Sequence, residues 1–511
     1  MISRRKILKG GAAAVVIASV PFIKPRFTFA QSALPFDYFI SPNGDDNNAG
    51  SLASPWSITA LNSKQSMYSG KRIGIIGDIG GTQTAIQHGT IGGAQTALFS
   101  RYQAGGSAPV LVINGGTSSA STYIASCNSA GVYTPRWAII DFSNPSGGAK
   151  PTVENIAMGQ SFYQTSVPNP GYTTVDALTI RNFTFAGLGF SNLAGPGTMP
   201  GIIIQNCEIS NGGNVVSNNN PGAILLAGAS NPVITNNKIH DLQTIPGGAD
   251  PMWGLSALRT YASTGIVFTH NTCFNCSSVL TKDSHQWFAN CSYNYLDHGV
   301  FGSAGPGGDL SAGSIVGHSP GPGQTSVIHH NIMLGGMGMH PQDGLAVAGI
   351  VQFYNNTLYG SSSYGSTFDA VTADNAAAGA ALQFYHNIVY AMSGYDTAPA
   401  SIMVQSACAV ANATFNNNVY GSNSNGVSFS RSYSGASLAA WRSATGCDQN
   451  SVLVSSSPFT GTPTTQVPSS FAAGNSAVIG GVMCGAIDGS GIVGCNFSSE
   501  PVPAAPALNV S

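Results

Sequence analysis

The chain reads Phe353-Tyr-Asn-Asn356-Thr-Leu-Tyr359 and then, 31 residues later, Phe384-Tyr-His-Asn387-Ile-Val-Tyr390. Both segments are one phrase: an apolar residue, two variable residues, Asn, two more residues, and an apolar or aromatic residue. Five earlier segments follow the same phrase, and they are Ile203–Ile209, Val233–Ile239, Phe268–Phe274, Trp287–Tyr293 and Ile328–Leu334. Asn182 and Asn417 fit it more loosely. The middle of the chain is therefore a repeat.

The phrase is short, and it is rich in β-branched and aromatic residues, which favour strands. The spacing from one Asn to the next varies between 19 and 41 residues, so the strands repeat while the segments between them vary. Asn tolerates left-handed φ and suits a bend, and stacked Asn side chains can form ladders. We therefore predict an all-β fold, a single-stranded right-handed parallel β-helix, with the phrases in register and their apolar residues facing inward.

The segments on either side of the repeat support this prediction. Tyr38–Ser51, with Pro55-Trp56, resembles the opening of many β-helix polysaccharide-active proteins, and Ser437–Trp441 with Asn475–Gly480 resembles their ending. The chain as a whole resembles the pectate-lyase-like right-handed parallel β-helix proteins, a group of polysaccharide lyases and glycoside hydrolases. We expect an N-terminal cap and first coils over 31–110, the β-helix over 111–430, and a C-terminal capping region and tail over 431–511.

The first 30 residues are typical of an export signal. Ser3–Lys9 is basic and contains the pair Arg4-Arg5, the stretch Gly10–Ile23 is apolar but too short for a membrane span, and Thr28–Ala30 offers small residues for cleavage. This pattern resembles a twin-arginine signal. We expect residues 1–30 to be removed, and the protein to be periplasmic or secreted without a membrane anchor.

The charge pattern excludes some partners. Six of the 18 Lys and Arg residues lie in residues 1–30, which leaves 12 against 20 Asp and Glu and a net charge of −8 for the rest. Nucleic acids attract clustered cations, so we expect no nucleic-acid partner. Charged residues make up only 7% of the chain, far below the usual ~25%. Neutral polar groups must therefore solvate most of the surface.

The nine cysteines are scattered and odd in number, which does not suggest a disulfide framework. Cys273 and Cys276 form a lone CxxC without a second pair, so we expect them to be buried as small apolar residues. A disulfide among Cys447, Cys484 and Cys495 stays open as an alternative after export.

Ionisable residues are rare enough for their positions to be informative. Seven of the ten histidines fall between 270 and 340, and the only Lys or Arg residues between 151 and 430 are Arg181, Lys238, Arg259 and Lys282. We expect the site within residues 250–345. Two pairs each follow a predicted strand, His240-Asp241 and Asp297-His298, and a turn cap is the alternative interpretation of either pair. Four histidines lie beside the Asn of the phrase and are interpreted as structural: His270, His329, His330 and His386.

Two features refine this expectation. The Gly- and Pro-rich excursion 299–324 should form neither strand nor helix, and we expect it to wall a binding groove. Lys282, eight residues before Asn290, resembles the base of the family that includes chondroitinase B and several alginate lyases. That family has an Arg on the following coil as the acid; none follows here, and His318 is the nearest candidate.

The leading hypothesis is a lyase that cleaves a uronic-acid-containing polysaccharide by β-elimination. It needs a base, an acid and a group that neutralises the carboxylate, so Lys282 is the base, His318 or His298 the acid, and Arg259 or a Ca²⁺ ion the neutralising group. Asp297 is a further catalytic candidate and, with Asp283 and Asp343, a candidate Ca²⁺ ligand. The candidate substrate-binding residues are His285, Asp309, His340 and Trp287.

Two alternatives stay open. A glycoside hydrolase would use two carboxyl groups from Asp283, Asp297, Asp309 and Asp343. A non-catalytic carbohydrate-binding or surface β-helix protein would instead line its groove with aromatic residues such as Trp253, Tyr261 and Trp287.

Overall fold

The computed structural model describes part of the chain, and all of that part belongs to one compact unit, Pro35–Ser511. Within some of its strands only the backbone is described. Residues 1–34, which include the expected export signal 1–30, lie outside the described residues. The described ranges are 35–86, 109–143, 155–161, 171–191, 198–213, 222–242, 255–276, 278–282, 286–297, 313–318, 320–334, 336–340, 349–360, 369–373, 381–391, 400–404, 413–422, 427–429, 437–455, 477–479 and 482–485.

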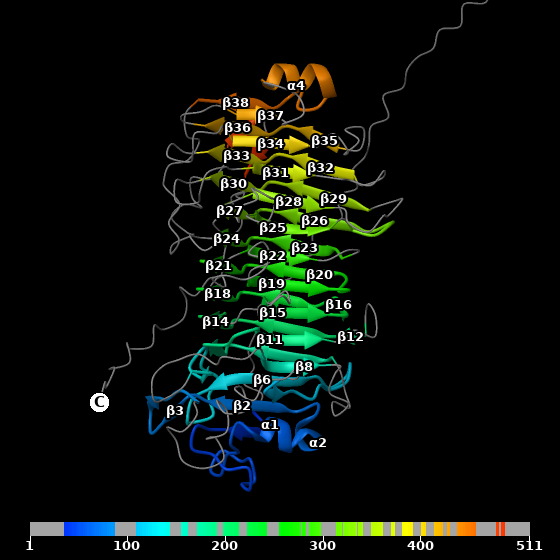
Figure 1. Cartoon of the computed structure of the whole chain (residues 1–511). Coiled ribbons are helices and arrows are strands. Elements are labelled where there is room, and N and C mark those ends of the chain that lie inside the picture. Colours follow the sequence, from blue (N-terminus) through cyan, green and yellow to red (C-terminus); the bar gives the residue numbers. More distant parts are fainter. Residues whose placement is uncertain are drawn as a thin grey trace, which may run out of the picture. The chain divides into compact units, whose positions relative to one another are not determined.

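Three long parallel sheets make up the fold (Figure 1). Sheet 1 has 12 strands, which in order are β1 (Tyr38–Ile40), β2 (Arg72–Ile76), β6 (Thr122–Cys127), β9 (Thr173–Asp176), β13 (Ile202–Gln205), β17 (Val233–Thr235), β20 (Ile266–Thr269), β23 (Phe288–Ser292), β26 (Thr325–His329), β29 (Ile350–Tyr354), β32 (Ala381–Tyr385) and β35 (Ala413–Asn416).

The other two long sheets have 11 strands each. Sheet 2 contains β7 (Ile139–Asp141), β10 (Thr179–Arg181), β14 (Glu208–Ser210), β18 (Lys238–His240), β21 (Thr272–Phe274), β24 (Tyr295–Asp297), β27 (Ile332–Leu334), β30 (Thr357–Gly360), β33 (Ile388–Ala391), β36 (Val419–Ser422) and β38 (Val452–Val454). Sheet 3 contains β5 (Leu111–Val112), β8 (Ile156–Ser161), β11 (Ala186–Ser191), β15 (Gly222–Ala227), β19 (Ser256–Tyr261), β22 (Ser278–Lys282), β25 (Gly313–His318), β28 (Gly336–His340), β31 (Asp369–Ala373), β34 (Ala400–Val404) and β37 (Val427–Phe429).

Small elements complete the described part. The pair β12 (Met199–Pro200) and β16 (Ala229–Ser230) is parallel, whereas β3 (Asp78–Ile79) with β4 (Thr82–Gln83), and β39 (Ala477–Ile479) with β40 (Val482–Cys484), are antiparallel. The helices are α1 (Ala60–Ser63), α2 (Gln65–Tyr68) and α4 (Leu438–Thr445). No described helix is long and apolar enough to cross a membrane.

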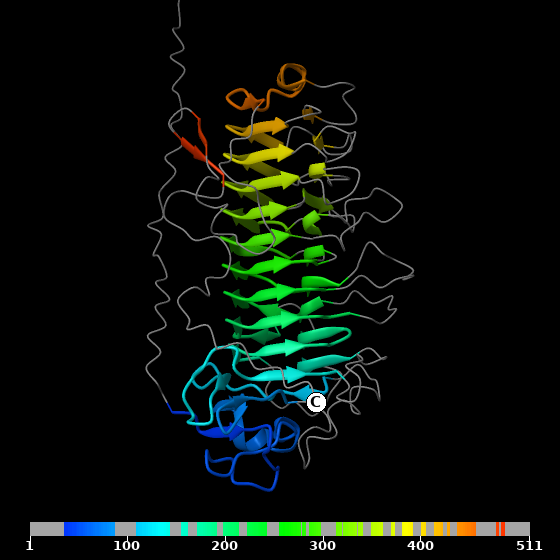
Figure 2. The same cartoon turned by 90° about the vertical axis from the view of Figure 1, so that its left-hand side faces the viewer.

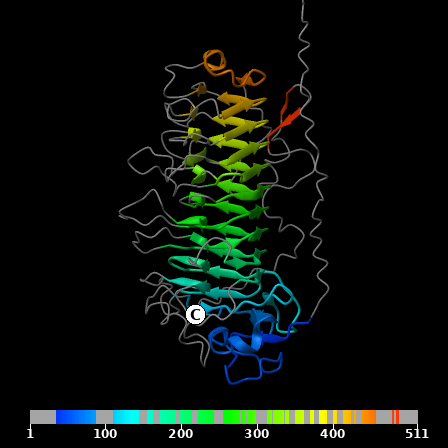
Figure 3. The same cartoon turned by 90° about the vertical axis from the view of Figure 1, so that its right-hand side faces the viewer.

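Each coil visits the three sheets in a fixed order. The chain passes from β11 in sheet 3 to β13 in sheet 1 and β14 in sheet 2, and it returns to sheet 3 as β15. Strands of successive coils pair in parallel, and Figure 2 and Figure 3 show their succession from blue to orange. The described strands therefore form the predicted parallel β-helix.

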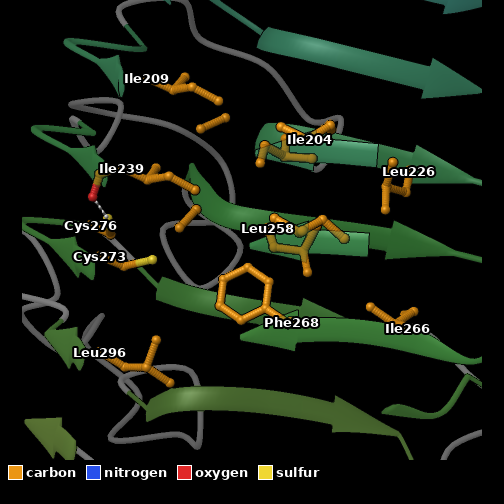
Figure 4. Packing of buried hydrophobic residues seen from close by; sticks show 14 of the residues in the cluster. Ile204, Ile209, Leu226, Ile239, Leu258, Ile266, Phe268, Cys273, Cys276 and Leu296 are labelled. Atoms are coloured by element: carbon orange, nitrogen blue, oxygen red, sulfur yellow. Dashed lines mark hydrogen bonds between the residues drawn. The ribbon is translucent and has the colours of Figure 1, made fainter. Parts of the chain in front are cut away.

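The interior is built from the inward half of each strand. Side chains of a strand alternate between its two faces. The inward residues of sheet 1 include Ile204, Ile234 and Phe268, which are fully buried. Those of sheet 2 include Ile209 and Ile239, which are also fully buried. Figure 4 shows Ile204 and Phe268 packed in the interior with Ile209 and Ile239. Each such side chain stabilises the fold by ~1.5–3 kcal/mol through removal of apolar surface from water.

An asparagine ladder runs between sheet 1 and sheet 2. From Asn271 onward, the side-chain oxygen of each Asn accepts hydrogen bonds from both the backbone and the side-chain N–H of the Asn one coil before it, over distances of 2.8–3.3 Å. The oxygen of the first, Asn237, accepts from the backbone N–H of Cys207. The last Asn418 donates to the buried carboxylate of Asp448. The ladder consists of Asn237, Asn271, Asn294, Asn331, Asn356, Asn387 and Asn418.

The bend lies one residue before the ladder. At this position φ is between 50° and 57°, and the residues are Asn206, Asn236, His270, Tyr293, His330, Asn355, His386 and Asn417. The predicted phrase mixes the two positions. Asn206 and Asn236 are bend residues, Asn271 and Asn331 are ladder residues, and Asn290 belongs to neither because it pairs with Val267 within sheet 1.

This difference of one residue between the phrases corrects the prediction that all of them lie in one register. The first residues of the phrases do not share one register, because Ile203 pairs with Val233, and Val233 pairs with Val267 rather than with Phe268. Ile203 and Val233 consequently lie on the outer face, half-buried. The physical reason is that Asn suits both the left-handed bend and the buried ladder. The Asn of the sequence pattern can therefore be the bend residue in one coil and the ladder residue in another.

A second correction concerns the excursion 299–324. Gly313–His318 forms strand β25, which pairs with β22 on one side and β28 on the other. Glycine weakens a strand by roughly 0.5–1 kcal/mol, but hydrogen bonds from two neighbouring coils outweigh that cost here. Residues 298–312 lie outside the described ranges, so the expected groove wall stays a prediction.

The described cysteines are buried, which confirms the interpretation of Cys273 and Cys276 as interior residues. Cys447 and Cys484 are not joined to each other. Burial raises the pKa of the Cys207 thiol to about 12, so it stays protonated and unreactive at neutral pH. The seven are Cys127, Cys207, Cys273, Cys276, Cys291, Cys447 and Cys484.

We predict that these thiols react only after unfolding. Cys408 and Cys495 lie outside the described residues, so both should first be replaced by serine. In this variant a thiol-specific reagent should label no cysteine of the native protein within minutes, and seven after denaturation. Mass spectrometry of the labelled protein counts them, and rapid labelling of any of the seven in the native state would contradict their burial.

Candidate functional site

Four of the predicted site residues lie on consecutive strands of sheet 3. Arg259 is in β19, Lys282 in β22, His318 in β25 and His340 in β28. The backbone of Lys282 pairs with Thr260 on one side and with Gly317 on the other. His318 pairs directly with His340. Residues up to 81 positions apart in the sequence are thus brought onto four consecutive strands of one sheet.

Arg259 lies on the outer face of sheet 3. Its partner Leu225 belongs to a small apolar cluster with Ile156 and Ala186, which is separate from the interior core that contains Leu226 and Leu258. Alternate residues of a strand face opposite sides, so the register row of Leu225 and Arg259 is an outer row.

The guanidinium of Arg259 is held by a tyrosine from the same strand. Its Nε donates to the hydroxyl of Tyr261 at 3.0 Å, and its Cζ lies 5.0 Å from the centre of the Tyr261 ring. Arg259 is only 4% exposed. A buried guanidinium with a fixed orientation is suited to bind a carboxylate through two parallel hydrogen bonds.

The register separates the remaining candidates of sheet 3. Lys282 shares its row with Thr260 and Leu226, both buried. Thr260, Lys282 and Gly317 are successive partners in one register row. Tyr261 and His318 are the next residues of their strands, so they share the adjacent row, and His340 continues that row because it pairs with His318. The side chains of Lys282, His318 and His340 lie outside the described residues, as do His285, His298, Asp283, Asp309 and Asp343 entirely.

Two candidates lie on other sheets. Asp297 ends β24 in sheet 2, where it pairs with Leu334 and is fully buried. Trp287 precedes β23 of sheet 1 and is half-buried, and its carbonyl accepts a hydrogen bond from Ile266. Neither is on the sheet that holds Arg259.

Sheet 2 carries an ion-pair network that the sequence interpretation did not include in the site. The Glu208 carboxylate contacts Lys238 Nζ at 3.1 Å and His240 Nε2 at 2.9 Å. On its other side, His240 Nδ1 is 2.7 Å from the carboxylate of Asp241. The His240 ring stacks on Phe274, with centroids 4.7 Å apart. Lys238 and His240 are two of the rare ionisable residues, which was the available signal.

Both carboxylates of this network are held in their ionised form. Burial alone would raise the pKa of Glu208, but the hydrogen bond from His240 and the charge of Lys238 outweigh it and lower the pKa to about 2. Hydrogen bonds from Asn275 and His240 likewise outweigh burial and lower the pKa of Asp241. A glycosidase acid needs a raised pKa, so this pair suits stabilisation of the coils rather than hydrolysis.

We predict a pH-dependent contribution of Glu208 to stability. Because its pKa is lowered on folding, its contribution is complete above pH 4.5 and is lost as the pH falls to about 2. Glu208→Gln should therefore cost about 2 kcal/mol at pH 7, allowing for solvent screening, and almost nothing near pH 2. Urea unfolding of both proteins from pH 7 to pH 2 measures the difference, and parallel curves would contradict the prediction.

Comparisons with known proteins agree with the fold. A family model described as a right handed beta helix region matches residues 152–314. The chain is a right-handed parallel β-helix. The resemblance drawn from the sequence repeat is thereby confirmed for the fold. No curated protein matches the sequence.

Solved structures of similar fold share little sequence with this chain. A pectate lyase, Pel9A, is 13% identical, with 75% of this chain and 78% of that chain covered and a TM-score of 0.40. A lacto-N-biosidase from Eubacterium ramulus is 12% identical, with 82% and 66% covered and a TM-score of 0.36. XylC in complex with xylose is 11% identical, with 82% and 86% covered and a TM-score of 0.40.

Proposed function

We propose that this chain is an exported polysaccharide-cleaving enzyme, and that it is a lyase acting on a uronic-acid-containing polymer. The observation that carries the proposal is the buried, tyrosine-held Arg259 on the outer face of sheet 3, with Lys282, His318 and His340 on the next three strands. A cation and three groups able to move protons are the residue types that β-elimination requires.

The proposed reaction assigns a role to each group. Arg259 binds the uronate carboxylate and so makes the neighbouring C5 proton more acidic. One of the two histidines in the row of Tyr261, His318 or His340, takes that proton, the electron pair forms a double bond between C4 and C5, and the bond from C4 to the leaving oxygen breaks. The other histidine gives a proton to the leaving oxygen. Ca²⁺ on Asp283 and Asp343 would be an alternative neutralising group.

The basic, paired-arginine N-terminus supports export of this enzyme to the periplasm or the medium. Hydrolysis stays the alternative, and it would use two carboxyl groups from Asp283, Asp297, Asp309 and Asp343.

The test is an assay on polymers of different uronic acids. A lyase produces an unsaturated sugar end, which gives new ultraviolet absorbance in step with the rise in reducing ends. A rise in reducing ends without that absorbance would establish hydrolysis instead. No rise on any polymer tested, with the protein folded by circular dichroism, would favour a binding protein.

A further inference from the structure

The outer face of sheet 1 presents an ordered row of neutral polar and aromatic side chains. In β29, β32 and β35 the inward residues include Phe353, Phe384 and Phe415, which are buried. The rings of Phe353 and Phe384 are stacked, and that of Phe415 is tilted against Phe384, with centroids 5.2 Å apart in both pairs. The alternate residues face outward and are partly or fully exposed. These outward residues, here called the outer strip, are Gln352, Tyr354, Gln383, Tyr385, Thr414 and Asn416.

Side chains of the outer strip are aligned from one coil to the next. Gln352 Nε2 donates to Gln383 Oε1 at 3.0 Å. The rings of Tyr354 and Tyr385 stack with centroids 5.1 Å apart and planes within 6°. The ring of His329, from the preceding coil, also stacks on the Tyr354 ring, and the two ring centroids are 4.9 Å apart. Fixed side chains lose little conformational freedom when a ligand binds.

The outer strip carries no formal charge. From β13 to β35 no outward residue of sheet 1 in the described part is Asp, Glu, Lys or Arg. By contrast, Glu208 and Lys238 lie on sheet 2, and Arg259 on sheet 3. The outer strip therefore offers an amide and a phenol on β29 and on β32, and a hydroxyl and an amide on β35, and it offers no attraction to a polyanion.

We propose that the outer strip binds an extended chain of an uncharged polysaccharide that runs along the stack of strands. Amide groups both donate and accept hydrogen bonds, as sugar hydroxyls do. Tyrosines contribute large contact area with few rotatable bonds. The strands β29 and β32 repeat the same pair of groups at the strand spacing, and β35 continues them with Thr414 and Asn416, so successive sugars would meet polar contacts on each of the three strands. This site is separate from sheet 3 and does not depend on the proposed cleavage.

Affinity electrophoresis tests this with the full chain in gels that contain soluble xylan, soluble galactomannan or polygalacturonate. We expect retardation by at least one neutral polymer. Any retardation by polygalacturonate belongs to the proposed site on sheet 3 and should be the same in the wild type and in the variants of the outer strip. Two variants probe the strip: Thr414→Glu, at an exposed residue, and Gln383→Glu. Each should weaken binding at least tenfold. Gln449→Ala, at an exposed residue of the C-terminal region, is the matched control and should bind as the wild type.

Three results would overturn the proposal. The first is unaltered polysaccharide binding by the folded Thr414→Glu protein, and the second is no retardation of the wild type by either neutral polymer. The third is self-association of the wild type that Gln383→Glu abolishes, because the outer strip would then be a contact between copies of the chain. Lyase activity is measured separately by ultraviolet absorbance, so failure of the proposed function leaves this test intact.

Discussion

Replacing Asn331 with alanine is expected to destabilise the β-helix by about 3 kcal/mol or more, because it removes the middle of the buried ladder. The Asn331 side chain donates to the carbonyls of Cys291 and His329 and to Asn356, and it accepts from the backbone and side chain of Asn294. Alanine leaves these groups in the interior without the partner they now have, and each costs about 1–3 kcal/mol.

The neighbouring bend provides the matched control for Asn331. Asn355 is half-buried and has φ of 50°, a conformation that glycine adopts without strain. Asn355→Gly should change stability by less than about 0.5 kcal/mol. Urea unfolding followed by circular dichroism compares the two variants, and equal stabilities would mean that the ladder contributes no more than the bend.

The fold was predictable from the sequence because the repeat carries its own structural signal. Buried phenylalanines such as Phe353 and Phe384 alternate with outward residues, and Asn356 and Asn387 recur at the same place in each phrase. The exact register was not predictable for all coils, because bend and ladder both select Asn. Asn236-Asn237 fills both positions, so the pattern offers no means of choosing between them.

The candidate site was predictable only in part. Lys282 and His318 stand out in a chain with few ionisable residues, but the contact between Arg259 and Tyr261 requires knowledge that both face outward from one strand. The network of Glu208 and Lys238 joins residues 30 positions apart whose backbones are paired. Since coil lengths vary, no fixed spacing in the sequence reveals such a pairing.

The second large effect is expected at Arg259. Arg259→Lys should lower kcat/KM on the cleaved uronate polymer at least a hundredfold, about 2.7 kcal/mol of transition-state stabilisation. Lysine keeps the positive charge but lacks the planar fork that binds a carboxylate bidentately, and it loses the hydrogen bond from Nε to Tyr261. Tyr261→Phe should cause a smaller loss, about tenfold, because it removes only the group that orients the guanidinium.

Arg181 provides the matched control for this substitution. It lies at the end of β10 in sheet 2, and it pairs with Asp141 at 2.7 Å while remaining 41% exposed. Arg181→Lys should leave kcat/KM unchanged, because Arg181 belongs to sheet 2 and not to the proposed site on sheet 3. A merely structural role of Arg259 would lower the stability of the variant and the yield of folded enzyme, but not the turnover of the folded fraction. Active-site titration or a count of folded protein by circular dichroism separates these effects, and wild-type kinetics for folded Arg259→Lys would remove Arg259 from the mechanism.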